Sequence, residues 1–408
     1  MHPHVSGRSN AVIVTALRTP VGRYGGVLRD IRPDDLGAAV IASLVGSSGI
    51  DPATVDDVIW GCANQAGEDN RNVGRMSALL AGLPFSVPGT TVNRLCGSSL
   101  EAVIQGARAI RSGDAETVIA GGAESMTRAP YALAKRTPPG TGSLTAYDTA
   151  LGWRFPNPRM KEMFPLESMG ETAENVAERF GITREEQDRF ALASHMKAVS
   201  AQNSGSFADE IIPIDVPGAS GGSLSVSADE GPRADTSLEK LAALPPAFRT
   251  GGTVTAGNSS PLNDGASGVL IMSEARAQSA GFRPLARIAA SGVAGVDPRF
   301  MGMGPVPATR TALGRAGLSI DDIGCIELNE AFASQSIAVI RELGLRPERV
   351  NIQGGAIALG HPLGCSGTRI LATLLNCMRR HSVQWGVATM CIGVGQGIAV
   401  VVENQSGS

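Results

Sequence analysis

The order of strand-like and helix-like segments near the start of the chain recurs near its end, and this repetition restricts the fold most strongly. Residues 54–66, TVDDVIWGCANQA, have a counterpart in residues 320–333, IDDIGCIELNEAFA. In both segments an acidic pair precedes a short apolar run and then a polar turn. A supersecondary order that recurs in this way indicates an internal duplication. The sequence therefore predicts two similar α/β halves.

Each half alternates buried strands with amphipathic helices. Apolar runs that predict strands lie at 11–19, 55–63, 116–125, 285–295 and 386–391. Helical spacing of apolar residues is found at 34–45, 306–317 and 366–380, and after Cys96 as far as Ser112 and Gly113. The alternation predicts a mostly parallel sheet covered by helices. Functional residues should then gather beyond the carboxyl ends of the strands.

The middle of the chain breaks this alternation. It contains a segment rich in Pro, Gly and aromatic residues at 136–160, a helical pattern at 171–202 and a polar loop at 217–237. A long insertion of this kind often carries a binding surface. We therefore divide the chain into an N-terminal half, 10–131, completed by about 262–283, a loop domain, 132–261, and a C-terminal half, 284–404.

Composition and charge argue against several classes of protein. A net charge of −3 gives no sign of a nucleic-acid partner. The sequence contains no run of 18 or more apolar residues, the length that a membrane-spanning helix needs. The start, MHPHVSGRSN, lacks the apolar region of a secretory signal, and the end, NQSGS, is not a peroxisomal address. We expect a cytoplasmic protein. The six cysteines form no CxxC pair and no HExxH motif is present, so we expect neither a disulfide framework nor a metal site.

Cys96 lies in a Gly/Ser-rich turn immediately before a helical pattern, in the segment VNRLCGSSLEAVIQGARAI. The free N–H groups and the positive end of the dipole at a helix start favour a thiolate, as a nucleophile requires. A buried thiol that packs as a small hydrophobe is the commoner fate of cysteine. This stretch alone favours that simpler interpretation.

Three segments of the C-terminal half add further polar residues at predicted strand ends. Asn329 lies in CIELNEAFASQ, His361 in a glycine-rich loop, and Cys391 before GVGQG. Singly, they could be a helix cap, an ordinary loop histidine and a core thiol, and the glycines are weak evidence for a phosphate loop. Together with Cys96 they suit carbon–carbon bond chemistry on thioesters. One cysteine holds an acyl group, the histidine moves the thiol proton, the second cysteine moves an α-proton, and backbone N–H groups stabilise oxyanions.

Six segments in order resemble the signature blocks of the thiolase family over nearly the whole chain. They are NRLCGSSLEA, IAGGAESM, TVTAGNSSPLNDGA, NEAFA, GGAIALGHPLGCSG and CIGVGQG. The resemblance implies a five-layered αβαβα fold, built from two duplicated α/β halves plus a loop domain that covers coenzyme A. It also implies a coenzyme A-dependent acyltransferase, active as a homotetramer built from dimers, with coenzyme A as a substrate and no permanently bound cofactor.

The resemblance also implies a role for each site residue. Cys96 matches the acylated nucleophile, His361 the residue that activates it and Cys391 the acid/base cysteine. Asn329 matches the residue that holds a catalytic water, and the Gly393 N–H an oxyanion donor beside that of Cys96. Residues that match the lining of the coenzyme pocket are Met169, Arg233, Phe248, Ala256, Ser260, Ala331 and Phe332. For Arg233 an ordinary solvated loop charge is an alternative.

Other positions depart from the family pattern or match no role in it. Ser168 stands where many members have histidine, and Pro261 follows the coenzyme-binding serine in place of a small residue, so acyl specificity is left open. Four cysteines match no role and are predicted to be core thiols: Cys62, Cys325, Cys365 and Cys377.

The segments 61–76, 152–161 and MCIGVGQG resemble the 3-oxoadipyl-CoA members of the family more than the acetoacetyl-CoA members. The resemblance thus implies cleavage of 3-oxoadipyl-CoA by coenzyme A, yielding acetyl-CoA and a shortened acyl-CoA. This substrate has a distal carboxylate, and the two segments contain four cations that could bind it: Arg71, Arg154, Arg159 and Lys161.

Four other classes of protein are alternatives to this interpretation. A general acetyl-CoA C-acetyltransferase and a non-catalytic acyl-CoA-binding protein of the same fold stay open. The second usually lacks a reactive residue, whereas this chain has all four. A decarboxylating condensing enzyme typically lacks the second cysteine, which Cys391 supplies here. A nucleotide-dependent oxidoreductase is disfavoured because no Rossmann fingerprint opens the first strand–helix unit.

Overall fold

The computed structural model describes residues 9–135, 143–218 and 221–406. Most of the N-terminal decapeptide and the last two residues, on which the targeting expectations rest, lie outside the described residues. Part of the Pro- and Gly-rich segment 136–160 does so too.

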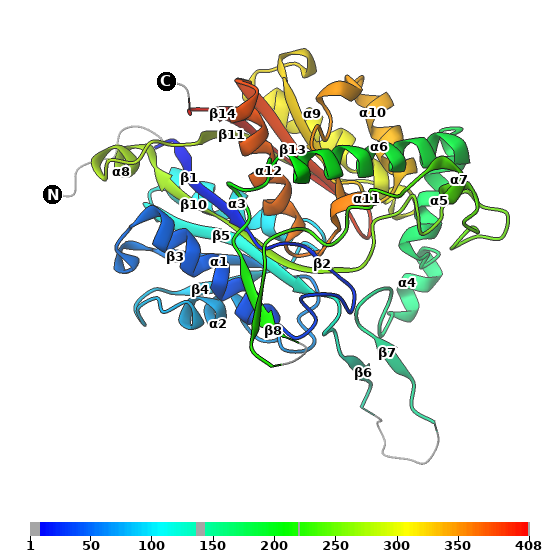
Figure 1. The fold of residues 1–408 in the computed structure, drawn as a ribbon, viewed down its shortest axis with the longest axis horizontal. Coiled ribbons are helices and arrows are strands. Elements are labelled where there is room, and N and C mark those ends of the chain that lie inside the picture. Colours follow the sequence, from blue (N-terminus) through cyan, green and yellow to red (C-terminus); the bar gives the residue numbers. More distant parts are fainter. Residues whose placement is uncertain (1–8, 136–142, 219–220, 407–408) are drawn as a thin grey trace.

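The two halves of the molecule share a common series of strands and helices (Figure 1). The N-terminal half has β1 (Ala11–Arg18), β2 (Gly22–Arg23), α1 (Pro33–Ser48), β3 (Asp57–Gly61), α2 (Val73–Leu80), β4 (Gly89–Val92), α3 (Ser98–Ser112), β5 (Thr117–Ser125) and, after the insertion, β10 (Asn263–Ser273) and α8 (Glu274–Ser279). The C-terminal half has β11 (Ala286–Gly295), α9 (Pro305–Ala316), β12 (Cys325–Leu328), α10 (Ala333–Leu343), α11 (Ala356–Leu359), α12 (Ser366–Arg380), β13 (Trp385–Ile392) and β14 (Gln396–Asn404). Short 3₁₀ turns lie at Pro52–Thr54, Pro298–Met303, Ile320–Asp322 and Pro347–Arg349.

The sheet confirms the internal duplication. Its strand order is β12-β13-β14-β11-β1-β10-β5-β3-β4, so β11, β14, β13 and β12 repeat the order of β1, β10, β5 and β3. The register of β1 on β10 shifts between Ile13 and Thr15, and that of β11 on β14 shifts between Ile288 and Ala290, at the equivalent place. The two halves join where Val12 and Ile13 of β1 pair with β11.

The expectation of a mostly parallel sheet is wrong. Parallel pairing is confined to β3 with β4, β3 with β5 and β12 with β13, among the strands of the described residues. β10 and β14 enter the centre of each half in the opposite direction. β14 does so because it follows β13 through a tight turn, which permits antiparallel pairing. β10 returns only after the long insertion, which the local alternation did not reveal.

The elements form the five layers αβαβα. α1 and α2 cover the outer side of the N-terminal strands, and α9 and α10 cover the outer side of the C-terminal strands. α3 and α12 lie between, in contact with each other and with strands of both halves. Their apolar faces share one cluster that includes Leu100, Ile104, Ile370 and Leu374. The central layer therefore places the first turns of α3 and α12 side by side.

The insertion forms a series of further elements, which include the 20-residue helix α6 (Figure 1). They are β6 (Tyr131–Leu133), β7 (Ala146–Asp148), α4 (Pro158–Met163), α5 (Met169–Arg179), α6 (Arg184–Asn203), β8 (Ile214–Pro217), β9 (Ser223–Val226) and α7 (Leu238–Ala242). The helical pattern at 171–202 is two helices, because Gly181 has a positive φ and Thr183 starts α6 with a capping box to Glu186. The three-part division of the chain stays a prediction.

Candidate active site

Cys96 lies in the short turn that joins β4 to α3. Leu95, just before it, has a φ of 48°, an unusual value for a branched side chain that signals a constrained turn. Gly97 caps the helix, and a Cβ there would lie 2.6 Å from Cδ1 of Ile392 on β13. A side chain at residue 97 would therefore require Ile392 to shift. Cys96 itself is half-buried.

The surroundings of Cys96 favour its protonated thiol. Burial raises its pKa, although the backbone N–H groups of Gly393 and of Cys96 itself hydrogen bond to the sulfur, and the pKa reaches about 11. The sequence suggested that this helix start would favour a thiolate at rest, but the raised pKa favours the thiol. The cost of desolvating the anion exceeds the stabilisation by the N–H groups.

Cys391 and Gly393 lie at the end of β13, next to Cys96. Cys391 is buried, and burial raises its pKa, with a further rise from negative charge on Cys96. The effect of the Cys96 sulfur on the pKa of Cys391, and the hydrogen bond that the Gly393 N–H donates to Cys96, place the two thiols and this N–H around one point.

His361 and Asn329 form a second buried pair at the same end of the sheet. Asn329 follows β12, and its N–H donates to the Thr389 carbonyl of β13 at 3.0 Å. The Asn329 Nδ2 lies 3.4 Å from the His361 Nε2. The Asn329 Oδ1 is buried without a partner among the described residues, so an acceptor is left for a bound water or substrate.

The contacts of the imidazole favour one tautomer. The Ser366 hydroxyl donates to the Pro362 carbonyl at 2.8 Å, and its oxygen lies 2.6 Å from the His361 Nδ1. With its one proton donated to Pro362, this hydroxyl accepts from Nδ1–H. The Nε2 lone pair then faces Asn329 and can accept a proton. Burial, with a smaller effect of the Arg369 cation, lowers the pKa of His361 to about 3, so the ring is neutral.

Hydrogen bonds fix the loop that carries His361 against the first turn of α3. The Ser99 hydroxyl donates to the Cys365 carbonyl at 3.0 Å and accepts from the Thr368 N–H at 3.0 Å. The His361 N–H donates to the Asn263 Oδ1 at 2.9 Å. Because Ser99 is three residues after Cys96, these contacts connect the histidine loop with the nucleophile turn.

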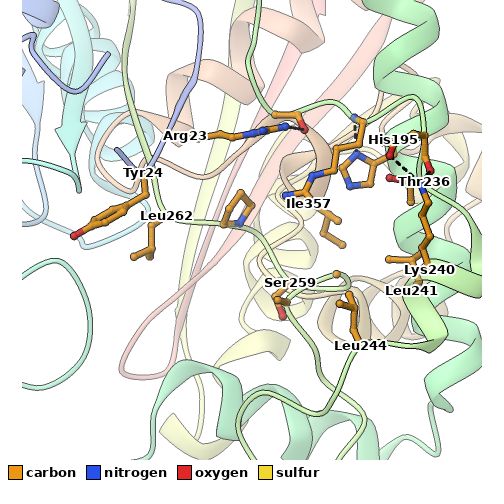
Figure 2. Close-up of a pocket in the computed structure, with 16 residues that line it drawn as sticks. Arg23, Tyr24, His195, Thr236, Lys240, Leu241, Leu244, Ser259, Leu262 and Ile357 are labelled. Atoms are coloured by element: carbon orange, nitrogen blue, oxygen red, sulfur yellow. Dashed lines mark hydrogen bonds and ion pairs between the residues drawn. The ribbon is translucent and has the colours of Figure 1, made fainter. Parts of the chain in front are cut away.

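A cavity of about 390 Å³ opens between the insertion and both halves of the molecule. Figure 2 shows Arg23 and Tyr24 approaching from one side and His195, Lys240 and Leu241 from the other. Of the residues predicted to bind coenzyme A, Arg233 and Ala256 line this cavity. Its cations, Arg23, Arg233 and Lys240, suit the phosphates of a nucleotide.

The other predicted coenzyme residues lie between this cavity and the cysteines. Met169, Ala331 and Phe332 pack in one apolar cluster with Cys391. Phe248 meets Phe332 edge to face, with ring centroids 6.2 Å apart. The Ser260 N–H donates to the Ala331 carbonyl at 3.0 Å, between cavity-lining Ser259 and Pro261. These residues lead from the cavity toward Cys391.

Residues 11–275 match the family described as the N-terminal domain of thiolases, and residues 282–404 match the C-terminal domain. The chain belongs to the thiolase family. It is 52% identical to a "Beta-ketoadipyl-CoA thiolase" of Acinetobacter baylyi, over 97% of this chain and 99% of the relative. It is 51% identical to an "Acetyl-CoA acetyltransferase" of Pseudomonas aeruginosa, over 96% and 99%. The crystal structure of the Bacillus anthracis acetyl-CoA acetyltransferase superposes with a TM-score of 0.91 at 42% identity, over 97% of this chain and 99% of that one.

Membership of the thiolase family confirms the predicted fold, and two further positions that the sequence singled out, Ser168 and Arg154, have local structural contacts. Ser168 is the N-cap of α5, where its hydroxyl accepts the Glu171 N–H at 3.3 Å. Of the four cations considered for a distal carboxylate, Arg154 is the one that is partly buried. Its guanidinium donates to the carbonyls of Thr149 at 3.0 Å and Asn64 at 2.7 Å.

Several cavity residues of this thiolase were not predicted from the sequence. They are distributed over β2, α6 and α7: Arg23, Tyr24, His195, Lys240, Leu241 and Leu244. No local pattern distinguishes them from surface residues. Arg23 and Tyr24 could have been suspected only from the positions of the halves, because they lie more than 150 residues from the rest of the lining.

One group of potential metal ligands lies close together among the described residues. It consists of Cys62, Asp69 and Glu124. Both carboxylates already accept backbone N–H groups, from Gln65 and Gly67 to Asp69 and from three donors to Glu124. Donors on these oxygens would oppose a cation, so the arrangement favours a hydrogen-bonded anchor.

Proposed function

We propose that the protein transfers acyl groups through a thioester on Cys96. The observation that carries this proposal is the arrangement of Cys96, Cys391 and the Gly393 N–H around one point, with the His361–Asn329 pair at the same end of the sheet. Thiol, imidazole and oxyanion donors are the groups that covalent acyl transfer needs.

In the direction of cleavage, the Cys96 sulfur attacks the 3-keto carbon while the thiol proton passes to Nε2 of His361. A neutral imidazole and a protonated thiol at rest mean that proton transfer accompanies attack. The bond between C2 and C3 then breaks, and Cys391 gives its proton to C2, which releases acetyl-CoA. The thiol of a second coenzyme A then gives its proton to Cys391 and attacks the acyl carbon, and the Cys96 sulfur leaves with the proton held by His361. Asn329 holds a water through Oδ1, and the N–H groups of Gly393 and Cys96 stabilise the oxyanions.

The cavity is proposed to hold coenzyme A as a substrate, with no other cofactor. Its cations would lie near the nucleotide phosphates, and the apolar path past Phe248, Phe332 and Met169 would carry the pantetheine arm to the cysteines. Its lining by residues of the insertion supports the proposed loop domain over the coenzyme.

The proposed acyl substrate is 3-oxoadipyl-CoA. Support comes from the names of relatives that match over nearly full length and from Arg154, which would bind the distal carboxylate. The Trp153 Nε1 donates to the Glu167 carbonyl at 3.2 Å, so this segment lies against the start of the Met169 helix. Two carbonyl contacts use only part of the five-donor guanidinium fork, which leaves donors for a carboxylate.

The experiment that tests this function is a thiolysis panel with purified protein. We expect 3-oxoadipyl-CoA to have a higher kcat/KM than acetoacetyl-CoA and a medium-chain 3-oxoacyl-CoA. A preference for acetoacetyl-CoA would instead support a general acetyl-CoA C-acetyltransferase, the alternative that the Pseudomonas relative's name favours. Binding without turnover of any substrate would indicate a non-catalytic acyl-CoA-binding protein.

We also propose a homotetramer in the cytoplasm, with roles in aromatic-compound and fatty-acid metabolism. The outer edge of β4 has no partner strand among the described residues, and Leu80 and Phe85 beside it are 55% and 89% exposed. Exposed apolar side chains beside a free edge favour association. Within the described part of the chain, no helix is long and apolar enough to cross a membrane.

A further inference from the structure

Glu124 connects the two halves of the molecule beneath the active site. It lies near the end of β5 and is 1% exposed. Its carboxylate accepts three backbone N–H groups, from Ala63 at 2.9 Å, Asn64 at 3.1 Å and Gly364 at 2.8 Å. The first two donors belong to the turn after β3, and the third belongs to the loop that carries His361.

The histidine loop rests directly on the end of β5. A Cβ on Gly364 would lie 2.8 Å from the Ala123 carbonyl oxygen and 2.9 Å from Glu124 Oε2. A Cβ on Gly122 would overlap the Gly364 carbonyl oxygen. The approach that brings the Gly364 N–H to Glu124 therefore requires glycine on both sides.

The other side-chain contacts that fix this loop are neutral. The Asn263 amide oxygen accepts the His361 N–H, and the Ser99 hydroxyl donates to the Cys365 carbonyl. Within residues 9–135, 143–218 and 221–406, Glu124 is the one ionisable side chain that hydrogen bonds to the backbone of the loop from His361 to Cys365. A hydrogen bond to a charged acceptor is stronger than a neutral one.

We propose that Glu124 is a positioning residue of the thiolase reaction, whose ionised carboxylate holds Gly364, and with it His361, in place beside Cys96. The proposal rests on the proposed roles of Cys96 and His361. It assigns no contact between Glu124 and substrate: the carboxylate acts through the loop.

The ionised form of Glu124 fits its surroundings and the protonated form does not. A carboxylate only accepts hydrogen bonds, so it matches three N–H donors, whereas a carboxylic acid would place an O–H among them. The titratable groups that face Glu124 are Asp69 and Cys62 after β3, Cys96 at the start of α3 and Cys365 in the histidine loop. Burial raises the pKa of Glu124 most, and the negative charge of Asp69 raises it further, to about 7.

The sign of the resulting pH dependence follows from these contacts. The competent form is ionised, so the rate of Cys96 acylation should be full above neutrality and should fall as the pH decreases through about 7. Glu124→Gln removes this titration, because the amide stays neutral, and also leaves an N–H₂ facing a backbone donor.

The test is single-turnover acylation of Cys96 by acetyl-CoA, measured by rapid quench and mass spectrometry from acid to alkaline pH. We expect Glu124→Gln to be acylated at least about tenfold more slowly and to keep the wild-type affinity for acetyl-CoA. We also expect it to lose the decrease in rate near neutrality, which is the acidic limb of the pH profile. The matched control is Asp56→Asn, at the opposite end of β5. Asp56 accepts the N–H groups of Glu116 and Thr117, at the start of β5, at 2.7 and 2.9 Å, whereas Glu124 lies near the end of that strand. Asp56→Asn should be acylated with the wild-type rate and pH profile.

A second variant, Asp69→Asn, tests whether Glu124 controls the acylation rate even if Glu124→Gln does not fold. It keeps Glu124 but removes a neighbouring negative charge, so the limb should move to lower pH. A wild-type limb in Asp69→Asn, or a wild-type rate and limb in Glu124→Gln, would overturn the proposal. Wild-type protein that forms no acyl-Cys96 at any pH would instead overturn the proposed function.

Discussion

At the scale of single residues, burial determines the chemistry of the site more than local sequence does. The turn before α3 gives Cys96 two N–H donors, yet its pKa rises to about 11 because the sulfur is desolvated. The same burial lowers the pKa of His361 to about 3 and raises that of Cys391. The reactive pairs are therefore neutral at rest, and their protons move during the reaction.

Separate proton transfers predict separable defects in the two cysteines. Acetyl-CoA should acetylate Cys96 in wild type and in Cys391→Ala, but Cys391→Ala should not exchange the α-protons of acetyl-CoA with solvent. Peptide mapping by mass spectrometry and NMR of deuterium incorporation measure the two steps. Cys377→Ala, a core thiol beside Cys325, is the control and should resemble wild type. Acetyl label on Cys377 with none on Cys96 would refute the assignment.

Arg154→Ala should reduce activity on 3-oxoadipyl-CoA selectively. A partly desolvated hydrogen bond to a charged group contributes about 1.5–3 kcal/mol, so kcat/KM should fall on the order of ten- to a hundredfold. Activity on acetoacetyl-CoA should stay within about threefold, because that substrate has no distal carboxylate. Exposed Arg159 supplies the control, as Arg159→Ala should affect neither substrate. Equal losses on both substrates would assign Arg154 a purely structural role through Thr149 and Asn64.

At the scale of elements, the contact between α3 and α12 aligns the two parts of the site. α3 begins two residues after Cys96, and α12 begins at Ser366, which contacts His361. The helices approach closely at Gly367, where a Cβ would lie 2.5 Å from the Leu100 backbone nitrogen. The spacing of the central layer therefore sets the position of Cys96 relative to His361.

Gly367→Ala should separate the two helix starts. Overpacking of a fully packed contact costs about 1–3 kcal/mol, and the displaced Ser366 and His361 should lower the acylation rate as well. Gly314→Ala in α9 is the matched control, because a Cβ there meets no atom within 4 Å. That variant should be more stable by about 0.5–1 kcal/mol, since alanine favours the helix. Denaturant unfolding and acylation rates check both variants. A Gly367→Ala enzyme with wild-type stability and rate would contradict the argument.

At the scale of the whole molecule, the sheet joins both halves but leaves the β4 edge free in the described structure. Edge strands with exposed apolar neighbours are usually covered in stable proteins. The hairpin of β6 and β7 projects from the body of the molecule, with Tyr131 and Leu133 exposed (Figure 1). Both features are consistent with an assembly of several copies.

Phe85→Glu should weaken that assembly. A charge at this 89% exposed position would oppose burial of the patch beside β4, so the tetramer should dissociate toward smaller species at micromolar concentration. Mass photometry and light scattering measure the distribution. Leu224→Glu, at an exposed position of β9 in the insertion, should leave the distribution unchanged. Wild-type protein that is monomeric would reject the tetramer.

The sequence alone determined the elements and their duplicated order, and it led to the proposed catalytic residues. Apolar periodicity placed α3 and α12 correctly because each buries one face in the central layer. Short blocks such as NRLCGSSLEA and GHPLGCSG pointed to the thiolase family because close-packed turns tolerate few residue types.

Tertiary structure decided whatever depends on distant partners. Strand direction followed from β10, which returns after the insertion, and the protonation states followed from burial. Arg23 lines the cavity, and Glu124 accepts a hydrogen bond from the His361 loop. Each contact depends on segments that lie far apart in the sequence. Local sequence patterns do not predict such contacts, because each contact joins residues that only the folded chain brings together.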